Sequence, residues 1–136
     1  MDQTTTTDLT IASGLLLERF EGAIVLGLPG TDYQLHLAAD ESMSAAPGTR
    51  LSGRIGARAR RVDKAGGGGR YIEPVYGRPR RLQGRIAAAD HVANTITVHC
   101  VCPVVCELVS DQRAADFHIG DFVTFDVERG ARFQIA

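Results

Sequence analysis

The stretch GRIAAADHVANTITVHC, residues 84–100, carries the clearest fold information in a chain of 136 residues. Its two ends are rich in small apolar and β-branched residues, and the polar segment Asp90–Asn94 separates them. This pattern predicts two strands joined by a hairpin loop. Asn94 is the expected left-handed residue of that loop, because its short polar side chain tolerates a positive φ.

Similar patterns lie on both sides of this hairpin. Apolar or alternating runs bounded by Gly, Pro and Asp predict further strands, whereas helical periodicity is scarce. Short helical turns are expected only at 13–19 and 111–116. The fold class is therefore expected to be all-β. The further strands are expected at Phe20–Leu26, Tyr33–Leu37, Leu51–Ile55, Phe122–Glu128 and Ala131–Ile135.

The two halves of the sequence contain the same order of features. Each has a Gly-x-Ile stretch, a His-bearing strand and a Gly turn that opens a further strand. Repetition of this kind indicates an internal duplication. A lone three-stranded sheet is barely stable, so the two copies are expected to pack together, as one barrel or as two abutting barrels. The matched positions are Gly22 with Gly84, His36 with His99, and Gly48 with Gly120.

The second half resembles the small five-stranded barrels of the OB class. The resemblance rests on GRIAAADHVANTITVHC and on FHIGDFVTFDVERGARF, residues 117–133, in which a Gly-x-Ile strand and hairpin precede a turn into a bulged strand. It covers about half of the chain and brings no catalytic motif. Together with the internal duplication, the resemblance implies two similar OB-like units, and it implies a ligand among oligonucleotides, oligosaccharides or other proteins.

These patterns divide the chain into four parts. Residues 1–17 are expected to be a flexible N-terminal segment, and residues 18–62 a first barrel-like unit. Residues 63–80 are expected to form a Gly/Arg-rich connecting loop, and residues 81–136 a second barrel-like unit. No run of 18 apolar residues and no basic N-terminal region is present, so neither a membrane span nor a signal peptide is expected. A cytoplasmic protein without a membrane partner is the expectation.

The net charge of −1 conceals an uneven distribution of charge. Residues 50–85 contain eleven basic and two acidic side chains, which gives a net charge of +9. Residues 1–49 contain one basic and seven acidic side chains, and residues 86–136 contain three basic and seven acidic ones. A basic block between two acidic blocks indicates one strongly positive face.

Arginines at alternate positions of residues 50–60 are expected to share one face of a strand, with Leu51 and Ile55 on the opposite, buried face. Four glycines and a segment rich in Arg, Tyr and Pro follow. Arginine grips phosphates with a planar fork, and tyrosine offers a stacking surface for bases. The candidate binding residues are Arg50, Arg54, Arg58, Arg60, Arg70, Tyr71, Tyr76, Arg78, Arg80 and Arg81.

Two functions fit this surface equally well. One is binding of single-stranded nucleic acid or RNA, because Arg, Tyr and Gly together suit phosphates and bases. The other is protein assembly, with an acidic partner protein or in a homo-oligomer, because Arg and Tyr are also enriched at protein interfaces. The sequence leaves this choice open.

The three cysteines are expected to be reduced and structural. Cys100, Cys102 and Cys106 are an odd number without an export signal, and their spacing differs from that of zinc-binding pairs. The four glycines at 66–69 lack the Lys and Ser/Thr of a phosphate-binding P-loop, and no nucleophile motif is present. No metal, no cofactor and no enzymatic activity are therefore expected.

Overall fold

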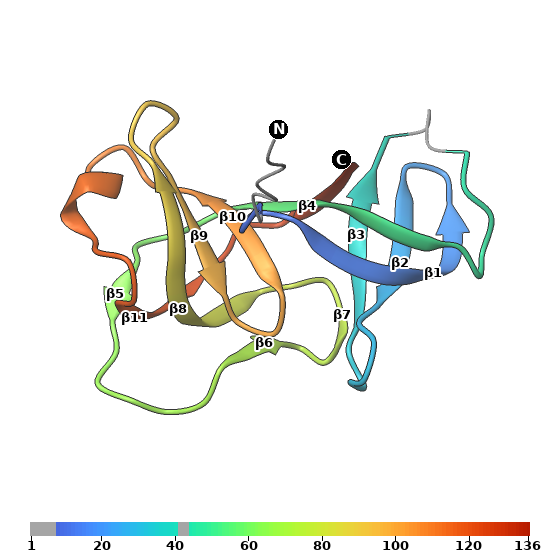
Figure 1. Ribbon diagram of the computed structural model, residues 1–136, viewed down its shortest axis with the longest axis horizontal. Helices are drawn as coiled ribbons and strands as arrows, with labels where there is room; N and C mark the ends of the chain where they lie inside the picture. Colours follow the sequence, from blue (N-terminus) through green and yellow to red (C-terminus); the bar gives the residue numbers. More distant parts are fainter. Residues whose placement is uncertain (1–7, 41–43) are drawn as a thin grey trace, which may run out of the picture.

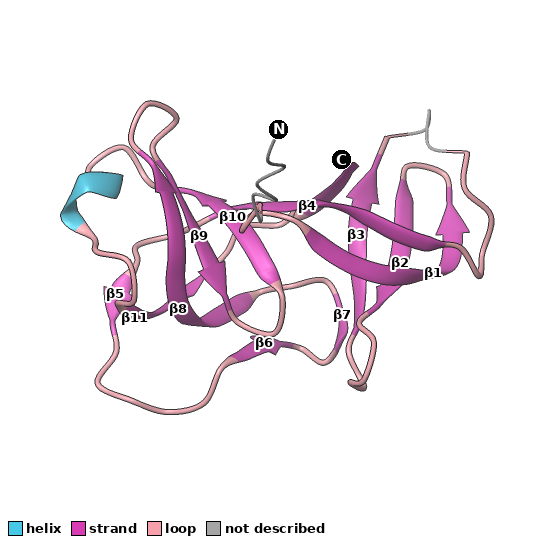
Figure 2. Ribbon diagram, in the orientation of Figure 1, coloured by secondary structure: helices cyan, strands magenta, loops and turns pink. Residues whose placement is uncertain are grey.

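The computed structural model describes residues 8–40 and 44–136. Strands dominate these residues, and a single 3-10 turn, η1 (Ala114–Asp116), is the one helical element among them (Figure 2). The all-β expectation is therefore confirmed, although the helical turn expected at 13–19 is part of a strand. In the described part of the chain, no helix is long and apolar enough to span a membrane.

Five strands close into a small barrel. Going round the barrel, each strand pairs with the next, and β1 returns to pair with β4. The pairing of β3 with β12 is parallel and the other four are antiparallel. This closed five-stranded arrangement is consistent with the OB-like barrel that the sequence resembles. Its strands, in order, are β1 (Ala12–Phe20), β2 (Ala23–Gly27), β3 (Gln34–Ala39), β12 (Arg132–Ile135) and β4 (Arg50–Arg58).

A second group of strands is built mainly from the second half of the chain. In this group β11 pairs with β8, β8 with β9, and β9 with β10, all antiparallel. The end of β4 joins the group by pairing in parallel with β10, and a bridge between Ala59 and Val127 links the continuation of β4 to that of β11. The strands from this half are β8 (Arg81–Asp90), β9 (Thr95–His99), β10 (Pro103–Glu107) and β11 (Phe122–Asp126).

The two groups exchange strands. The end of β4 leaves the first barrel and pairs with β10 of the second group, and β12 leaves the second half to pair with β3 and β4 of the first barrel. Figure 1 shows β4 running from one group of strands to the other. All strands consequently belong to a single sheet. The last strand was expected in the second unit, but it completes the first barrel instead.

The segment expected as a connecting loop, residues 63–80, is attached to the sheet at three places. It contains β5 (Asp63–Lys64), which pairs with β11, and β6 (Tyr71–Glu73), which pairs with β8. It also contains β7 (Tyr76–Gly77), which pairs with β3 of the first barrel. The segment therefore bridges both groups of strands. At the expected boundary between the N-terminal segment and the first unit, β1 begins at Ala12, inside the segment 1–17 that was expected to be flexible.

The core of the molecule is continuous from one half to the other. Strand residues alternate between buried and exposed positions, as in β4, where Leu51 and Ile55 are buried and Arg50 and Arg54 are exposed. The buried cluster takes side chains from both groups of strands, and its two largest members are Phe125 and Phe133. Because β12 contributes Phe133 to the first barrel, the C-terminal strand is part of that core.

The structure corrects two of the three matched pairs of positions. Gly22 lies in the turn between β1 and β2, whereas Gly84 lies inside β8. His36 lies on β3 and His99 lies at the end of β9, so these two residues do not occupy matching places either. The third pair corresponds, because Gly48 and Gly120 have φ angles of 95° and 93° and each precedes a strand that pairs with the first strand of its half. Asn94 has the expected positive φ, 57°.

A different match relates the pairings of the two halves. β1 and β2 pair with a bulge between Leu16 and Glu18, and β8 and β9 pair with a bulge between Ile86 and Ala88. The amide of Gly48 donates to the carbonyl of Leu16, and the amide of Gly120 donates to the carbonyl of Ile86. This match aligns β1 with β8. In this alignment Gly14, rather than Gly22, is the position equivalent to Gly84.

Candidate functional site

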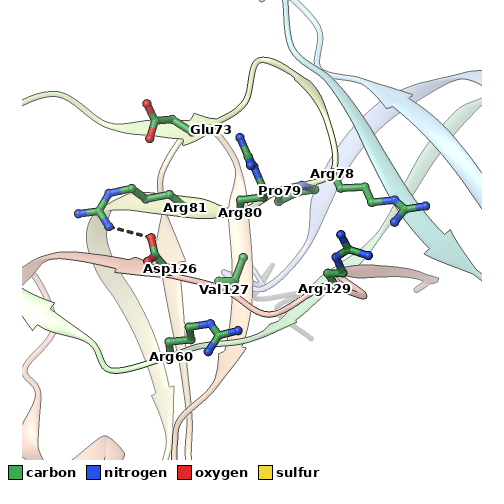
Figure 3. A pocket seen from close by; sticks show the side chains of 9 residues that line it. All are labelled: Arg60, Glu73, Arg78, Pro79, Arg80, Arg81, Asp126, Val127 and Arg129. Atoms are coloured by element: carbon green, nitrogen blue, oxygen red, sulfur yellow. Dashed lines mark hydrogen bonds and ion pairs between the residues drawn. The ribbon is translucent and has the colours of Figure 1, made fainter.

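An open cleft of about 530 Å³ lies where the two groups of strands meet. It is lined by the continuation of β4, by the end of β6, by the residues that lead into β8 and its first residue, and by the end of β11 with the turn after it (Figure 3). Five of its nine lining residues are arginines and two are acidic, so the cleft has an excess of positive charge. The lining residues are Arg60, Glu73, Arg78, Pro79, Arg80, Arg81, Asp126, Val127 and Arg129.

Arg81 is held by its neighbours. Its guanidinium donates to the carboxylate of Asp126 over 2.8 Å and to the hydroxyl of Thr124 over 2.9 Å. The interaction with the Tyr71 side chain, followed by that with Asp126, raises the pKa of Arg81 above its ordinary value. Since its charge is already matched by a carboxylate, Arg81 anchors β8 to β11 and offers little free charge to a ligand.

The other four arginines of the cleft have no such partner. Within residues 8–40 and 44–136, no hydrogen bond or ion pair involves their side chains, and all four are exposed. Arg78 and Arg80 lie on either side of the buried Pro79, which fixes the backbone between them. In Figure 3 the side chain of Arg129 rises from the turn after β11 on the side where Arg78 lies. The unpaired arginines of the cleft are Arg60, Arg78, Arg80 and Arg129.

The predicted arginine stripe on residues 50–60 has the expected alternation, but only its last member reaches the cleft. Arg50, Arg54 and Arg58 are exposed on the face opposite the core. Arg54 is paired with Asp8 over 2.6 Å and donates to Thr10 over 2.9 Å, so its charge is matched. Of the stripe, Arg60 alone lines the cleft.

The aromatic residues of the bridging segment are placed outside the cleft. The hydroxyl of Tyr71 donates to the side chain of Gln83, whose amide donates to the carbonyl of Gly69. These bonds fix the end of the glycine run to β8. Tyr76 meets the ring of His36 edge-on, with 4.9 Å between ring centroids, and remains 59% exposed.

Arg70 lies 3.3 Å from the ring of His99, which is also away from the cleft. The cleft therefore gathers four of the ten predicted residues: Arg60, Arg78, Arg80 and Arg81. Arg129 lines the cleft as well, and it is not among the ten residues predicted from the sequence. Its position beside Arg78 depends on the strand exchange, for which the sequence contains no local pattern.

The three cysteines are buried and none forms a disulfide. The thiol of Cys100 lies 3.4 Å from the carbonyl oxygen of Cys102. Burial raises the pKa of Cys100 to about 11 and also raises those of Cys102 and Cys106, which makes these thiols poor nucleophiles near neutral pH. Among the described residues, no group of three His, Cys, Asp or Glu side chains could hold a metal ion.

Comparison of the chain with protein-family models, with curated proteins and with solved structures finds no match. The chemistry of the cleft is therefore the basis for a functional assignment.

Proposed function

We propose that this chain is a non-enzymatic binding protein that holds single-stranded nucleic acid by its phosphates in the arginine cleft. The observation that carries the proposal is the set of four arginines without partners, brought together from three segments of the chain. Guanidinium groups match phosphate oxygens bidentately and are weakly hydrated, so they suit this ligand better than lysines would.

Several features favour a flexible strand over a compact anion. The cleft is open, and it lies on a junction between two groups of strands rather than inside a barrel. Small β-barrels bind oligonucleotides among other ligands, which is an argument from fold alone. A single strand can bend its backbone so that successive phosphates meet the separated guanidinium groups, whereas a duplex is too stiff to do so.

The test is a titration of a labelled single-stranded oligonucleotide at a series of salt concentrations. If all four unpaired arginines contact phosphates, log K should fall with log salt with a slope of about −3. Changing Arg60→Ala and Arg129→Ala together should reduce the size of that slope by about 1.4, because two contacts are lost. The matched control changes Arg50→Ala and Arg113→Ala, two exposed arginines that line no part of the cleft.

The control pair should leave the slope unchanged. Absence of binding at low salt, or equal slopes for the two double variants, would refute the proposal. Separate titrations with RNA and DNA strands decide which nucleic acid binds more tightly.

The second candidate is assembly with an acidic protein surface or with a second copy of the chain. The observation in its favour is the exposure of Val75 and Tyr76 beside the cleft arginine Arg78, because aromatic residues and arginine are enriched at interfaces. Under this function, salt should matter less, and Tyr76→Ala should weaken association more than the loss of any single arginine. Light scattering at increasing concentration measures self-association directly.

We further propose that the two halves descend from one duplicated unit, with β1 equivalent to β8. The matching bulges, the matching Gly48 and Gly120 turns and the reciprocal exchange of strands support this proposal. The duplicated unit would contain four strands of its own barrel and a fifth strand that enters the other unit.

A further inference from the structure

A second cavity, of about 390 Å³, adjoins the arginine cleft on the outer face of the first barrel. It lies over β2 and β3, and no expectation from the sequence placed a site there. Arg78 lines both this cavity and the arginine cleft, so the two adjoin at its side chain. Its lining includes Phe20, Ile24, His36, Ala38, Arg78 and Ala131.

The lining of this cavity suits a flat aromatic group. Phe20, at the end of β1, is 56% exposed although it is a large apolar side chain. The glycines Gly22 and Gly130 leave the walls beside it without side chains, and both have positive φ angles that other residues rarely adopt. An exposed aromatic ring beside bare backbone is a surface on which a planar ring can stack.

One polar atom of this cavity's lining has no partner. The Nε2 atom of His36 is buried and makes no hydrogen bond within the described residues. Leaving such an atom unpaired is unfavourable, because it has lost its contact with water. His36 lines the cavity, but its Nε2 atom is shielded from solvent, so a ligand with a hydrogen-bonding edge reaches this atom only after a neighbouring side chain moves aside. The ring of Tyr76 covers one side of His36 and could move, since it is largely exposed.

We propose that this second cavity binds a base of the single strand whose phosphates lie in the arginine cleft. The inference rests on the proposed function, and it adds an orientation of the bound nucleotide to it. The base lies towards Phe20, the phosphates lie towards Arg60 and Arg129, and Arg78 lies between them. A nucleobase is the one part of a nucleic acid that combines a stacking face with a hydrogen-bonding edge.

The central variant is Phe20→Ala, which removes the stacking surface. Because Phe20 is exposed, this change leaves the core intact. Loss of one base–aromatic stack should weaken oligonucleotide binding about tenfold. The slope of log K against log salt should stay unchanged, since no phosphate contact is lost. The control is Val92→Ala, another exposed apolar residue, which lies in the hairpin loop between β8 and β9 and lines neither cavity.

A strand containing 2-aminopurine reports on the base itself, because its fluorescence falls when the ring stacks. The fluorescence should fall on binding to the unchanged protein and to the Val92→Ala variant, and it should not fall with Phe20→Ala. If Phe20→Ala and Val92→Ala bind alike and both quench the probe, the base site is refuted. The phosphate contacts are then judged separately by the salt slopes of the arginine variants.

Discussion

Gly84 occupies a position in β8 that no other residue can fill without a shift of the backbone. A Cβ atom there would collide with the carbonyl oxygen of His99 and lie 2.8 Å from the Cα atom of Cys100. Both contacts are with the main chain, which cannot rotate away as a side chain can. Gly14, at the matched position of β1, would place a Cβ atom 2.9 Å from the carbonyl oxygen of Gly27.

We therefore expect Gly84→Ala to lower the free energy of unfolding by about 1–3 kcal/mol, as overpacked cores do. Urea denaturation followed by circular dichroism measures this. The control is Gly67→Ala, at a position where an added Cβ atom meets nothing within 4 Å. Equal stability of the two variants would show that β8 can move away from β9.

At the scale of single elements, most of the longer strands could be predicted, with β1 and β10 as exceptions, and the shortest strands could not. The hairpin of β8 and β9 follows from its composition, and so does the positive φ of Asn94. β6 and β7 are three and two residues long and are held by backbone pairing with strands distant in sequence, which leaves no periodic pattern. Ser13–Arg19 contains three consecutive leucines, and such a run fits a helix or a strand equally well.

The candidate site could likewise be predicted only in part. The alternation of Arg50, Arg54 and Arg58 follows from strand geometry, but their partners do not. Asp8 neutralises Arg54 from 46 residues away in the sequence, and Arg129 joins the cleft only because β12 crosses to the first barrel. Charge density along the sequence located the basic region and could not locate the unpaired charges within it.

The bridging segment provides a prediction about exchange of backbone amide hydrogens. The amide of Arg80 donates to the carbonyl of Glu73 over 2.8 Å, and the amide of Gln34 donates to the carbonyl of Val75 over 2.9 Å. We expect these two amides to exchange with solvent more slowly than those of Gly67 and Gly69, which are exposed in the glycine run. Nuclear magnetic resonance in deuterated buffer measures the rates. Similar rates at all four amides would mean that the segment is a free linker.

At the scale of the whole molecule, the exchange of strands makes the two halves depend on each other. Phe133 lies on β12, from the second half, and is 1% exposed in the core of the first barrel. Phe133→Ala should lower the free energy of unfolding by about 3–5 kcal/mol. Because the core is continuous, both groups of strands should unfold in the same transition.

The measurement is thermal unfolding followed residue by residue with amide resonances from β2 and from β9. Coincident midpoints in the unchanged protein and in the variant would agree with a single cooperative unit. Loss of the β2 resonances at a temperature where those of β9 persist would contradict it. The matched control is Phe20→Ala, which removes the same side chain from an exposed position.

The positions of β1 and β12 also determine how the molecule carries a mechanical load. Ala12 and Ile135 pair with the same residue, Gly53, from opposite sides of β4, and both strands run antiparallel to β4. A force that draws the beginning of β1 and the end of β12 apart therefore acts across the strands, along the direction of their hydrogen bonds to β4. It unzips these bonds one after another from the two strand ends instead of shearing them all at once, so we expect the barrel to open from its ends under load.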